Sequence, residues 1–362
     1  MNEFILPLIK IFVGIILLFT GGEFFIQGSV ALSLVLGIPQ IVIGLTVVAL
    51  GTSSPELLVS LNSVLKGSDG LAVSNIIGSN IFNILVVLGI SSLIRPLKVK
   101  SRIVRRDVPL LIAISCAVWA ISSTGLLTWQ SGIFLIFCLI INTIWEINTI
   151  NEKDEDTKTA EPEINDSLSK KNKFNIIGKL LIGILLLGFG SNILVNSART
   201  LAILIGINET IIGLTIVATG TSLPELVTSI VAAFKGRTDL AIGNVIGSNL
   251  LNQLLILGSC SLFSGIRGLT INSDLIKTDL PIMVLTTFAC MPIFWTKGKI
   301  TRDEGFILVN IYIFYVLDKI LFLSKFGLLK EFRVFIFIYL TICFFVLLSK
   351  NKFKILGFES NT

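Results

Sequence analysis

The sequence predicts an all-α polytopic membrane protein, built from two inverted five-helix repeats that form a ten-helix core, with an eleventh helix at the C-terminus. Three observations favour this fold class. Apolar residues fill 53% of the 362 positions and charged residues only 14%, with a mean hydropathy of +0.90, whereas soluble domains carry about 25% charged residues. Windows of roughly 20 apolar residues, the length of a membrane-spanning helix, recur along the chain. Long segments of the second half repeat segments of the first.

Five apolar stretches precede the one long polar segment, five follow it, and a further apolar run lies near the C-terminus. The polar segment, 149–173, has too few apolar residues to bury a core, so we expect a flexible loop there, including its acidic part, 152–166. The first stretch lacks a basic leader and a cleavage site of small residues, which indicates a retained span. The predicted spans are 4–27, 40–65, 71–94, 108–124, 128–148, 174–200, 208–234, 239–264, 278–296, 303–323 and 333–349.

The internal repeat sets the predicted architecture. With an offset of 169, IVIGLTVVALGTSSPELLVS aligns with TIIGLTIVATGTSLPELVTS, and AVSNIIGSNIFNILVVLG aligns with AIGNVIGSNLLNQLLILG. Because each repeat has an odd number of spans, the second must enter the membrane from the opposite side. Such inverted repeats place their substrate site near the bilayer midplane, between the repeats. The predicted parts are a first repeat (1–148), a charged linker (149–173), a second repeat (174–323) and a C-terminal helix with a basic tail (324–362).

Basic residues predict the orientation. With the N-terminus outside, nineteen Lys and Arg fall on the cytoplasmic side, in 95–106, the linker, 235–237, 297–302 and the tail, against eight outside. This bias favours a cell (plasma or inner) membrane protein with a cytoplasmic linker. It also explains the net charge of +6 without a nucleic-acid partner.

Composition argues against an enzyme. The chain has no histidine, which removes Ser-His and Cys-His catalysis and most zinc chemistry. Its five cysteines lie within apolar stretches without metal-type spacing. No paired-acid motif of an intramembrane hydrolase is present, and a passive channel is the other alternative.

Two glutamates lie at predicted membrane depth, Glu56 in GTSSPE and Glu225 in GTSLPE. An acidic side chain at a helix centre costs about 3 kcal/mol, so its repetition in one setting indicates function. Pro55 lacks an N–H and clashes with the carbonyl of Gly51, so the helix must kink and free carbonyls near residues 49–52. Thr52, Glu56 and Ser60 follow an i, i+4, i+8 spacing and share a face. The second copy repeats this set with Ala218, Gly220, Thr221, Ser222, Pro224 and Glu225.

The next span in each half adds neutral oxygens. Asn75, Ser79 and Asn83 are spaced by four and share a face. Their counterparts are Asn244, Ser248 and Asn252. Hard oxygen ligands of this kind suit Ca²⁺ and Na⁺. Two ionised glutamates match the charge of one Ca²⁺, and several Na⁺ could share the same oxygens, so the two loads would compete.

The doubled G-T-S-x-P-E and G-S-N-x-x-N motifs, in inverted halves, resemble the α-repeats of the cation/Ca²⁺ exchanger superfamily, and most closely its prokaryotic Na⁺/Ca²⁺ exchangers. The resemblance covers 40–94 and 209–263 closely and 4–323 more weakly. It implies Na⁺-driven Ca²⁺ antiport by a monomeric unit in a lipid bilayer, with no cofactor and with Ca²⁺ and Na⁺ as the transported ions. The residues it implies as ligands are Ala49, Thr52, Ser53, Glu56, Ser79, Asn83, Ala218, Thr221, Ser222, Glu225, Ser248 and Asn252.

The chain departs from the family pattern at one site position. Asn252 stands where some relatives carry Asp, so the centre has two carboxylates and K⁺ co-transport is not implied. Proton sensitivity is then left to the glutamates, and Ca²⁺/H⁺ antiport is the alternative function. The family implies no role for 324–362.

Several polar residues fall outside the predicted ligand set. Three roles stay open for Asn75, Asn80, Asn244 and Asn249, which are capping, bridging between helices, and contact with water. Asp107 and Asp279 precede a proline by two residues and are predicted to cap helix N-termini. For Glu23, whose repeat counterpart is Asn192, we predict an interfacial or regulatory position rather than a place in the central site.

Overall fold

The computed structural model describes residues 2–150, 170–204, 218–295 and 298–323. Most of the predicted linker, the start of the seventh predicted span and the predicted eleventh helix lie outside these residues. Helices α8 and α9 extend into the predicted linker from both sides, ending at Ile150 and beginning at Lys170.

The described chain is helical apart from four two-residue strands and the turns. The α-helices are α1 (Asn2–Leu36), α2 (Gln40–Ile43), α3 (Ala49–Thr52), α4 (Ser54–Leu65), α5 (Asp69–Phe82), α6 (Gly89–Ile94), α7 (Val108–Ser122), α8 (Trp129–Ile150), α9 (Lys170–Leu204), α11 (Ala218–Gly220), α12 (Leu223–Phe234), α13 (Thr238–Leu251), α14 (Leu257–Phe263), α15 (Leu280–Trp295) and α16 (Arg302–Leu323). The strands are β1 (Leu97–Lys98), β2 (Leu126–Leu127), β3 (Leu269–Thr270) and β4 (Lys299–Ile300).

Six described helical segments are long and apolar enough to span a membrane, and the bent pair α2–α3 and α4 makes a possible seventh. The six are Phe4–Leu36, Asp69–Ile94, Trp129–Glu146, Phe174–Leu201, Thr238–Phe263 and Leu275–Trp295. They agree with six of the predicted spans to within a few residues, except that the first runs nine residues further. The predicted spans at 108–124 and 303–323 are helices α7 and α16.

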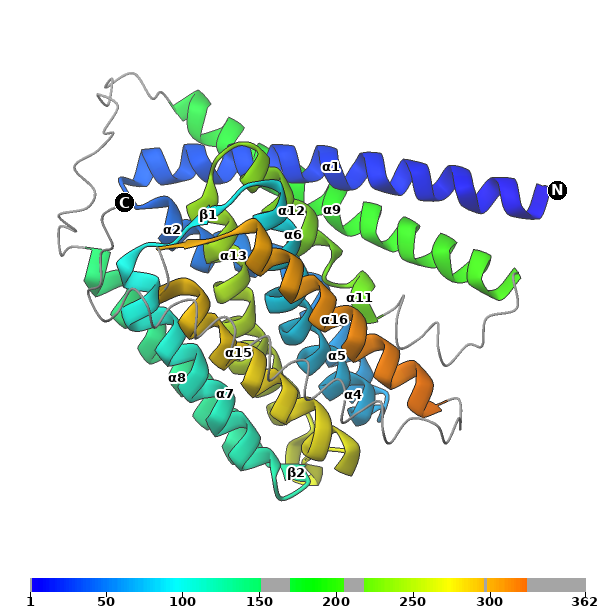
Figure 1. Cartoon of the computed structure of the whole chain (residues 1–362). Coiled ribbons are helices and arrows are strands. Elements are labelled where there is room, and N and C mark those ends of the chain that lie inside the picture. The colour runs from blue at the N-terminus through cyan, green and yellow to red at the C-terminus, as the bar shows by residue number, and fades with distance from the viewer. Residues whose placement is uncertain (1, 151–169, 205–217, 296–297, 324–362) are drawn as a thin grey trace, which may run out of the picture.

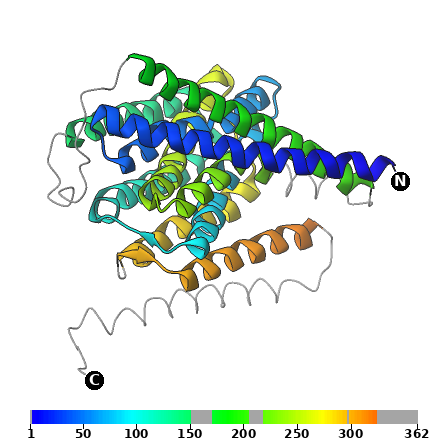
Figure 2. The same ribbon diagram turned by 90° about the horizontal axis from the view of Figure 1, so that it is seen from above.

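The helices form an inner layer and an outer layer. The α5–α6 span is 83% buried over its most apolar window and the α13–α14 span is 89% buried, against 22% for α1 and 28% for α9. Helices α1 and α9 lie side by side along one side of the bundle, and α16 lies along the opposite side (Figures 1 and 2). The polar motifs of α5 and α13 are therefore in the interior, whereas the apolar side chains exposed on α1 and α9 suit lipid.

The two halves exchange packing partners. A Cβ added to Gly132 of α8 would lie 2.8 Å from the carbonyl oxygen of Gly258 in α14. In the counterpart contact, a Cβ on Gly305 of α16 would lie 2.6 Å from the carbonyl oxygen of Gly89 in α6. The last helix of each half thus packs on the third span of the other half, and only glycine permits this approach.

Two short sheets join loops of the two halves. Strand β1 pairs with β4 and β2 pairs with β3, both antiparallel. Around the first sheet, Lys100 lies 3.0 Å from Asp239, and Arg302 donates to the carbonyl of Ile94. The segments 95–106, 235–239 and 298–302 therefore lie on one side of the bundle, as the orientation argument requires.

The prediction that Asp107 and Asp279 cap helices is wrong, because neither side chain bonds to the following backbone N–H groups. Each instead lies in a π-helical turn, Ile103–Asp107 or Leu275–Asp279. Asp279 accepts from Tyr315 (2.7 Å) and from Lys319 (2.6 Å), both on α16. The helical geometry continues through both aspartates, so there is no free helix start to cap.

Candidate functional site

The helix break predicted at Pro55 is present. Helix α3 ends at Thr52, Ser53 leaves the helical geometry, and α4 begins at Ser54 with its axis bent by 45°. The second half breaks in the same way, between Gly220 and Leu223. Because proline fits the first turn of a helix and not its interior, each break restarts a helix whose first turn carries the glutamate.

The carbonyls near these breaks are not equally free. Pro224 leaves the carbonyl of Gly220 without its helical donor, and the hydroxyl of Ser191 in α9 replaces it at 2.6 Å. The corresponding residue of α1 is Gly22, which has no donor to offer. The carbonyl of Ala49, a predicted ligand, accepts from the Ser53 N–H at 2.9 Å, and the Thr52 hydroxyl oxygen lies 3.3 Å from it.

The two glutamates are joined across the halves by serines. The Ser53 hydroxyl donates to Oε1 of Glu225 at 2.9 Å, and the Ser222 hydroxyl donates to Oε1 of Glu56 at 2.9 Å. Both carboxylates are fully buried, and Oε2 of each has no hydrogen-bond partner among the described residues. A buried carboxylate oxygen without a donor is costly, so the arrangement is suited to a cation.

A second symmetric pair of contacts lies beside the first. Thr52 donates to Oδ1 of Asn244 (3.0 Å), and Thr221 donates to Oδ1 of Asn75 (3.1 Å). Asn75 donates in turn to Ser60 (3.1 Å), and Asn244 donates to Ser229 (3.0 Å). The asparagines excluded from the predicted ligand set therefore hold the helix breaks of the opposite half in place, a bridging role for Asn75 and Asn244.

The remaining predicted ligands lie in the same interior layer. Ser79 lies 2.9 Å from the Ser222 hydroxyl. Asn83 and Asn252 each begin a π-helical turn, Asn83–Leu88 and Asn252–Ile256, a distortion often found at functional sites. Asn83 Oδ1, the Ser248 hydroxyl and both side-chain atoms of Asn252 have no partner within the described part of the chain.

Among the predicted site residues, the structure brings Ser53 to Glu225 and brings Ser222 to Glu56 and Ser79. The other predicted site residues lie on the segments around the two breaks and the two π-helical turns, with Ala218 at the first described position of its segment. No group of three or more His, Cys, Asp and Glu occurs among the described residues. The oxygens available besides the two carboxylates are thus neutral, which suits weakly held, exchangeable Ca²⁺ or Na⁺ better than a transition metal.

Sequence reasoning missed one buried polar residue of this layer. Gln253, which is 1% exposed, donates to Oδ1 of Asn80 at 3.2 Å. Its position next to Asn252 was visible, and so was its unlike counterpart, Ile84. A glutamine in one repeat where the other repeat has an isoleucine is a signal that a comparison of the halves could have found.

Comparison with known proteins agrees with this geometry. The family described as sodium/calcium exchanger protein matches residues 6–147 and 175–321. The inner membrane protein YrbG of Escherichia coli is 32% identical over 84% of this chain and 94% of its own length. The putative antiporter CaxA of Alkalimonas amylolytica is 34% identical over 85% of this chain and 96% of its own length.

Solved structures of the sodium-calcium exchanger NCX_Mj share the fold. In its form soaked with 10 mM Na⁺ and no Ca²⁺, the TM-score is 0.74 at 29% identity, over 87% of this chain and 99% of that one. The match extends over both repeats and most of the described helices. The chain belongs to the sodium/calcium exchanger protein family.

Proposed function

We propose that the protein is a secondary antiporter that exchanges Na⁺ for Ca²⁺ across the cell membrane by alternating access. The cation site lies at the midplane and is built from Glu56 and Glu225. The neutral oxygens of the predicted ligand set complete it. The observation that carries the proposal is the pair of crossed serine bonds, which orient both buried glutamates and leave one oxygen of each without a partner.

Charge balance favours exchange over leak. Two ionised carboxylates in the interior match one Ca²⁺, or the Na⁺ ions that replace it, and an empty charged site would be costly. The site is therefore occupied by cations each time it changes its exposure from one side of the membrane to the other. The inverted repeats supply the motion, because rocking one half against the other exposes a midplane site to each side in turn.

The topology belongs to the same proposal. Ten helices form the core, the N-terminus is outside and the linker 149–173 is cytoplasmic, with 324–362 adding a further helix outside the core. The functional unit is one chain. Support comes from the basic segments 95–106, 235–239 and 298–302, whose contacts hold them on one side of the bundle.

Transport by purified protein tests the function. Proteoliposomes are loaded with Na⁺, K⁺ or a proton gradient in turn, and uptake of ⁴⁵Ca²⁺ is measured. Uptake is expected with internal Na⁺ alone. Uptake driven by the proton gradient and not by Na⁺ would establish Ca²⁺/H⁺ antiport instead, and flux without any counter-ion gradient would indicate a channel.

Two variants test the site. Glu56→Gln and Glu225→Gln keep the side-chain shape and remove the charge, so each is expected to abolish Ca²⁺ uptake at a normal membrane level. Glu23→Gln is the matched control, because Glu23 pairs with Lys235 at the bundle surface and is 41% exposed. Near-normal uptake by either site variant would overturn the assignment.

A further inference from the structure

Four buried amide side chains form a network between the third spans of the two halves, and its orientation is fixed by backbone carbonyls. Asn80 donates Nδ2 to the carbonyl of Ile76 (2.7 Å), so its Oδ1 must act as an acceptor. Asn249 donates Nδ2 to the carbonyl of Asn80 (3.2 Å), so its Oδ1 is also an acceptor. A carbonyl cannot donate, and this leaves no freedom in how these two amides point.

The network orients Asn83 completely. Asn83 donates Nδ2 to Oδ1 of Asn249 at 3.1 Å. Its Oδ1 is then the atom left without a partner among the described residues. Asn83 therefore offers an oxygen, and only an oxygen, to a cation.

The repeat predicts the mirror bond, and that bond is absent. The counterparts of Asn83 and Asn249 are Asn252 and Asn80, so symmetry would have Asn252 donate to Oδ1 of Asn80. Instead Gln253 donates to that oxygen, with its Nε2 3.2 Å away. Both side-chain atoms of Asn252 remain without a partner in the described chain, although Asn252 is fully buried.

Two positions of the repeat differ here. Asn80 donates to the carbonyl of Ile76 in its own helix, whereas its counterpart Asn249 donates across the halves to the carbonyl of Asn80. The counterpart of Gln253 is Ile84, which is fully buried and has no donor, so nothing competes with Asn83 for Asn249. A carboxamide with neither atom bonded can turn over and present either its oxygen or its N–H groups. The site thus has one fixed amide oxygen, on Asn83, and one that can be added or withdrawn, on Asn252.

We propose that Gln253 is a positioning residue that donates to Oδ1 of Asn80 from the place that symmetry assigns to Asn252, and thereby keeps the Asn252 carboxamide free to turn. This inference rests on the proposed function, in which Asn252 contacts the transported cation. A ligand side chain that can turn adapts the site to two different ions. The affinity for Ca²⁺ is somewhat lower as a result, because ordering that side chain on binding has an entropic cost.

Replacing Gln253 tests this. In Gln253→Ile, which copies the first half, Asn252 can donate to Asn80 as Asn83 does to Asn249, and its oxygen is fixed towards the ion. We expect the Ca²⁺ concentration at half-saturation to fall by about three- to tenfold, because one side chain no longer has to be ordered on binding. Half-saturating Na⁺ should change less, and the maximal exchange rate should fall. Equilibrium ⁴⁵Ca²⁺ binding to purified protein, with Na⁺ competition, measures both ions.

A second substitution separates positioning from a packing effect. Asn80→Ala removes the acceptor, so Gln253→Ile with Asn80→Ala should return half-saturating Ca²⁺ to the wild-type value. A packing role would instead make the two defects add. Gln253→Met, similar in length and without a donor, repeats the test if the branched side chain disturbs the core.

Three results would overturn the inference. These are equal shifts for Ca²⁺ and Na⁺, no reversal by Asn80→Ala, or failure of both Gln253 variants to accumulate as folded protein, which would make the residue structural. Wild-type protein that binds no Ca²⁺ would instead refute the proposed function, and wild-type binding with unshifted variants would refute this inference alone.

Discussion

Single residues in this protein act across the repeat boundary. Ser53 and Ser222 hold glutamates of the opposite half, and Thr52 and Thr221 hold asparagines of the opposite half. The Ser222 hydroxyl lies 2.9 Å from both Glu56 and Ser79. Since a hydroxyl has one proton, donation to Glu56 requires Ser79 to donate to Ser222. Each carboxylate is therefore oriented before any ion arrives.

Loss of a crossed serine should weaken Ca²⁺ binding. In Ser53→Ala or Ser222→Ala, one glutamate loses its donor, and hydrogen bonds to charged groups contribute about 1.5–3 kcal/mol. Half-saturating Ca²⁺ in ⁴⁵Ca²⁺ uptake should rise by about tenfold or more. Ser54→Ala is the matched control, because that neighbouring hydroxyl bonds only to the carbonyl of Leu50. Wild-type affinity in both site variants would show that the crossed bonds do not prepare the site.

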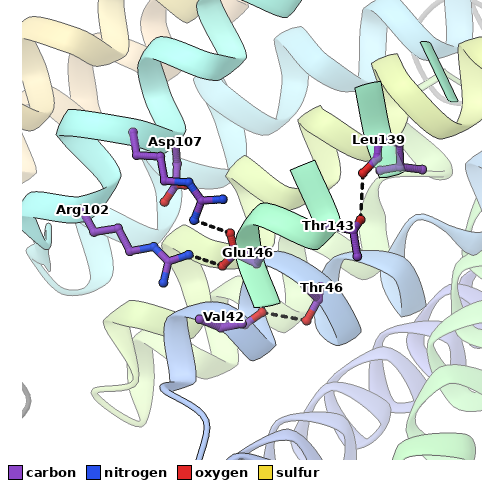
Figure 3. Close-up of polar contacts among 8 residues, drawn as sticks. Val42, Thr46, Arg102, Asp107, Leu139, Thr143 and Glu146 are labelled. Carbon is purple, nitrogen blue, oxygen red and sulfur yellow. Dashed lines mark hydrogen bonds and ion pairs between the residues drawn. The ribbon is translucent and has the colours of Figure 1, made fainter. Parts of the chain in front are cut away.

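At the scale of helices, the last helix of each half is anchored by a charged side chain at corresponding positions. Glu146 of α8 accepts hydrogen bonds from Arg102 and lies 2.7 Å from Arg106 (Figure 3). Its counterpart on α16, counted from the matching Gly132 and Gly305, is Lys319, which pairs with Asp279. The sign of the charge is reversed between the halves. The charged side chain contacts the equivalent π-helical turn in each half, Ile103–Asp107 or Leu275–Asp279.

Breaking the first anchor should destabilise the fold more than breaking the second. The Glu146 side chain is 6% exposed and faces two arginines, whereas Lys319 is 27% exposed. Removing one partner of a buried ion pair costs about 3–5 kcal/mol of stability, and solvent screening makes the cost smaller for an exposed ion pair. Glu146→Ala should therefore lower the melting temperature in detergent clearly more than Lys319→Ala. Equal losses would contradict the role assigned to burial.

The exchanged helix packing depends on glycine and can be tested directly. In Gly305→Ala the new Cβ would meet the Gly89 carbonyl and the Ser92 hydroxyl. Such overpacking costs about 1–3 kcal/mol, so the melting temperature should fall. Gly188→Ala in α9 is the control, since no described atom lies within 4 Å of its added Cβ. Alanine there should be neutral or stabilising, because it favours helix by up to about 1 kcal/mol. Similar losses in both variants would exclude close packing as the cause.

For the whole molecule, the arrangement of the loops gives the topology a physical basis. The sheets β1–β4 and β2–β3 each join one loop from each half. Around the first sheet lie the basic segments that the sequence assigns to the cytoplasm. Around the other, Arg267 forms a bidentate pair with Asp69 at 2.9 and 3.0 Å. The pairing of loops from opposite halves is what an inverted repeat requires on both sides of the bilayer.

Thiol labelling tests the orientation. In a background without the native cysteines, Lys66→Cys and Lys98→Cys place exposed thiols in two different loops. A membrane-impermeant maleimide should label Lys66→Cys in intact cells, and Lys98→Cys only after permeabilisation. The reverse pattern would invert the topology and would leave the exchange proposal unaffected.

The sequence alone determined the elements that follow from local backbone chemistry. Pro55 and Pro224 must break their helices because each lacks a donor, and a spacing of four must place Ser79 and Asn83 on one face. The repeat itself predicted that Glu56 and Glu225 occupy equivalent settings. These features needed no knowledge of distant contacts.

Only the tertiary structure decided which groups meet across the halves. It made Asn75 and Asn244 bridges, gave Asp279 to Lys319 and Tyr315, and let Gln253 take the acceptor that symmetry assigns to Asn252. The physical reason is that a side-chain amide or carboxylate accepts whichever donor packing brings within about 3 Å. That donor lies on a helix far away in the sequence, so periodicity within one helix cannot reveal it.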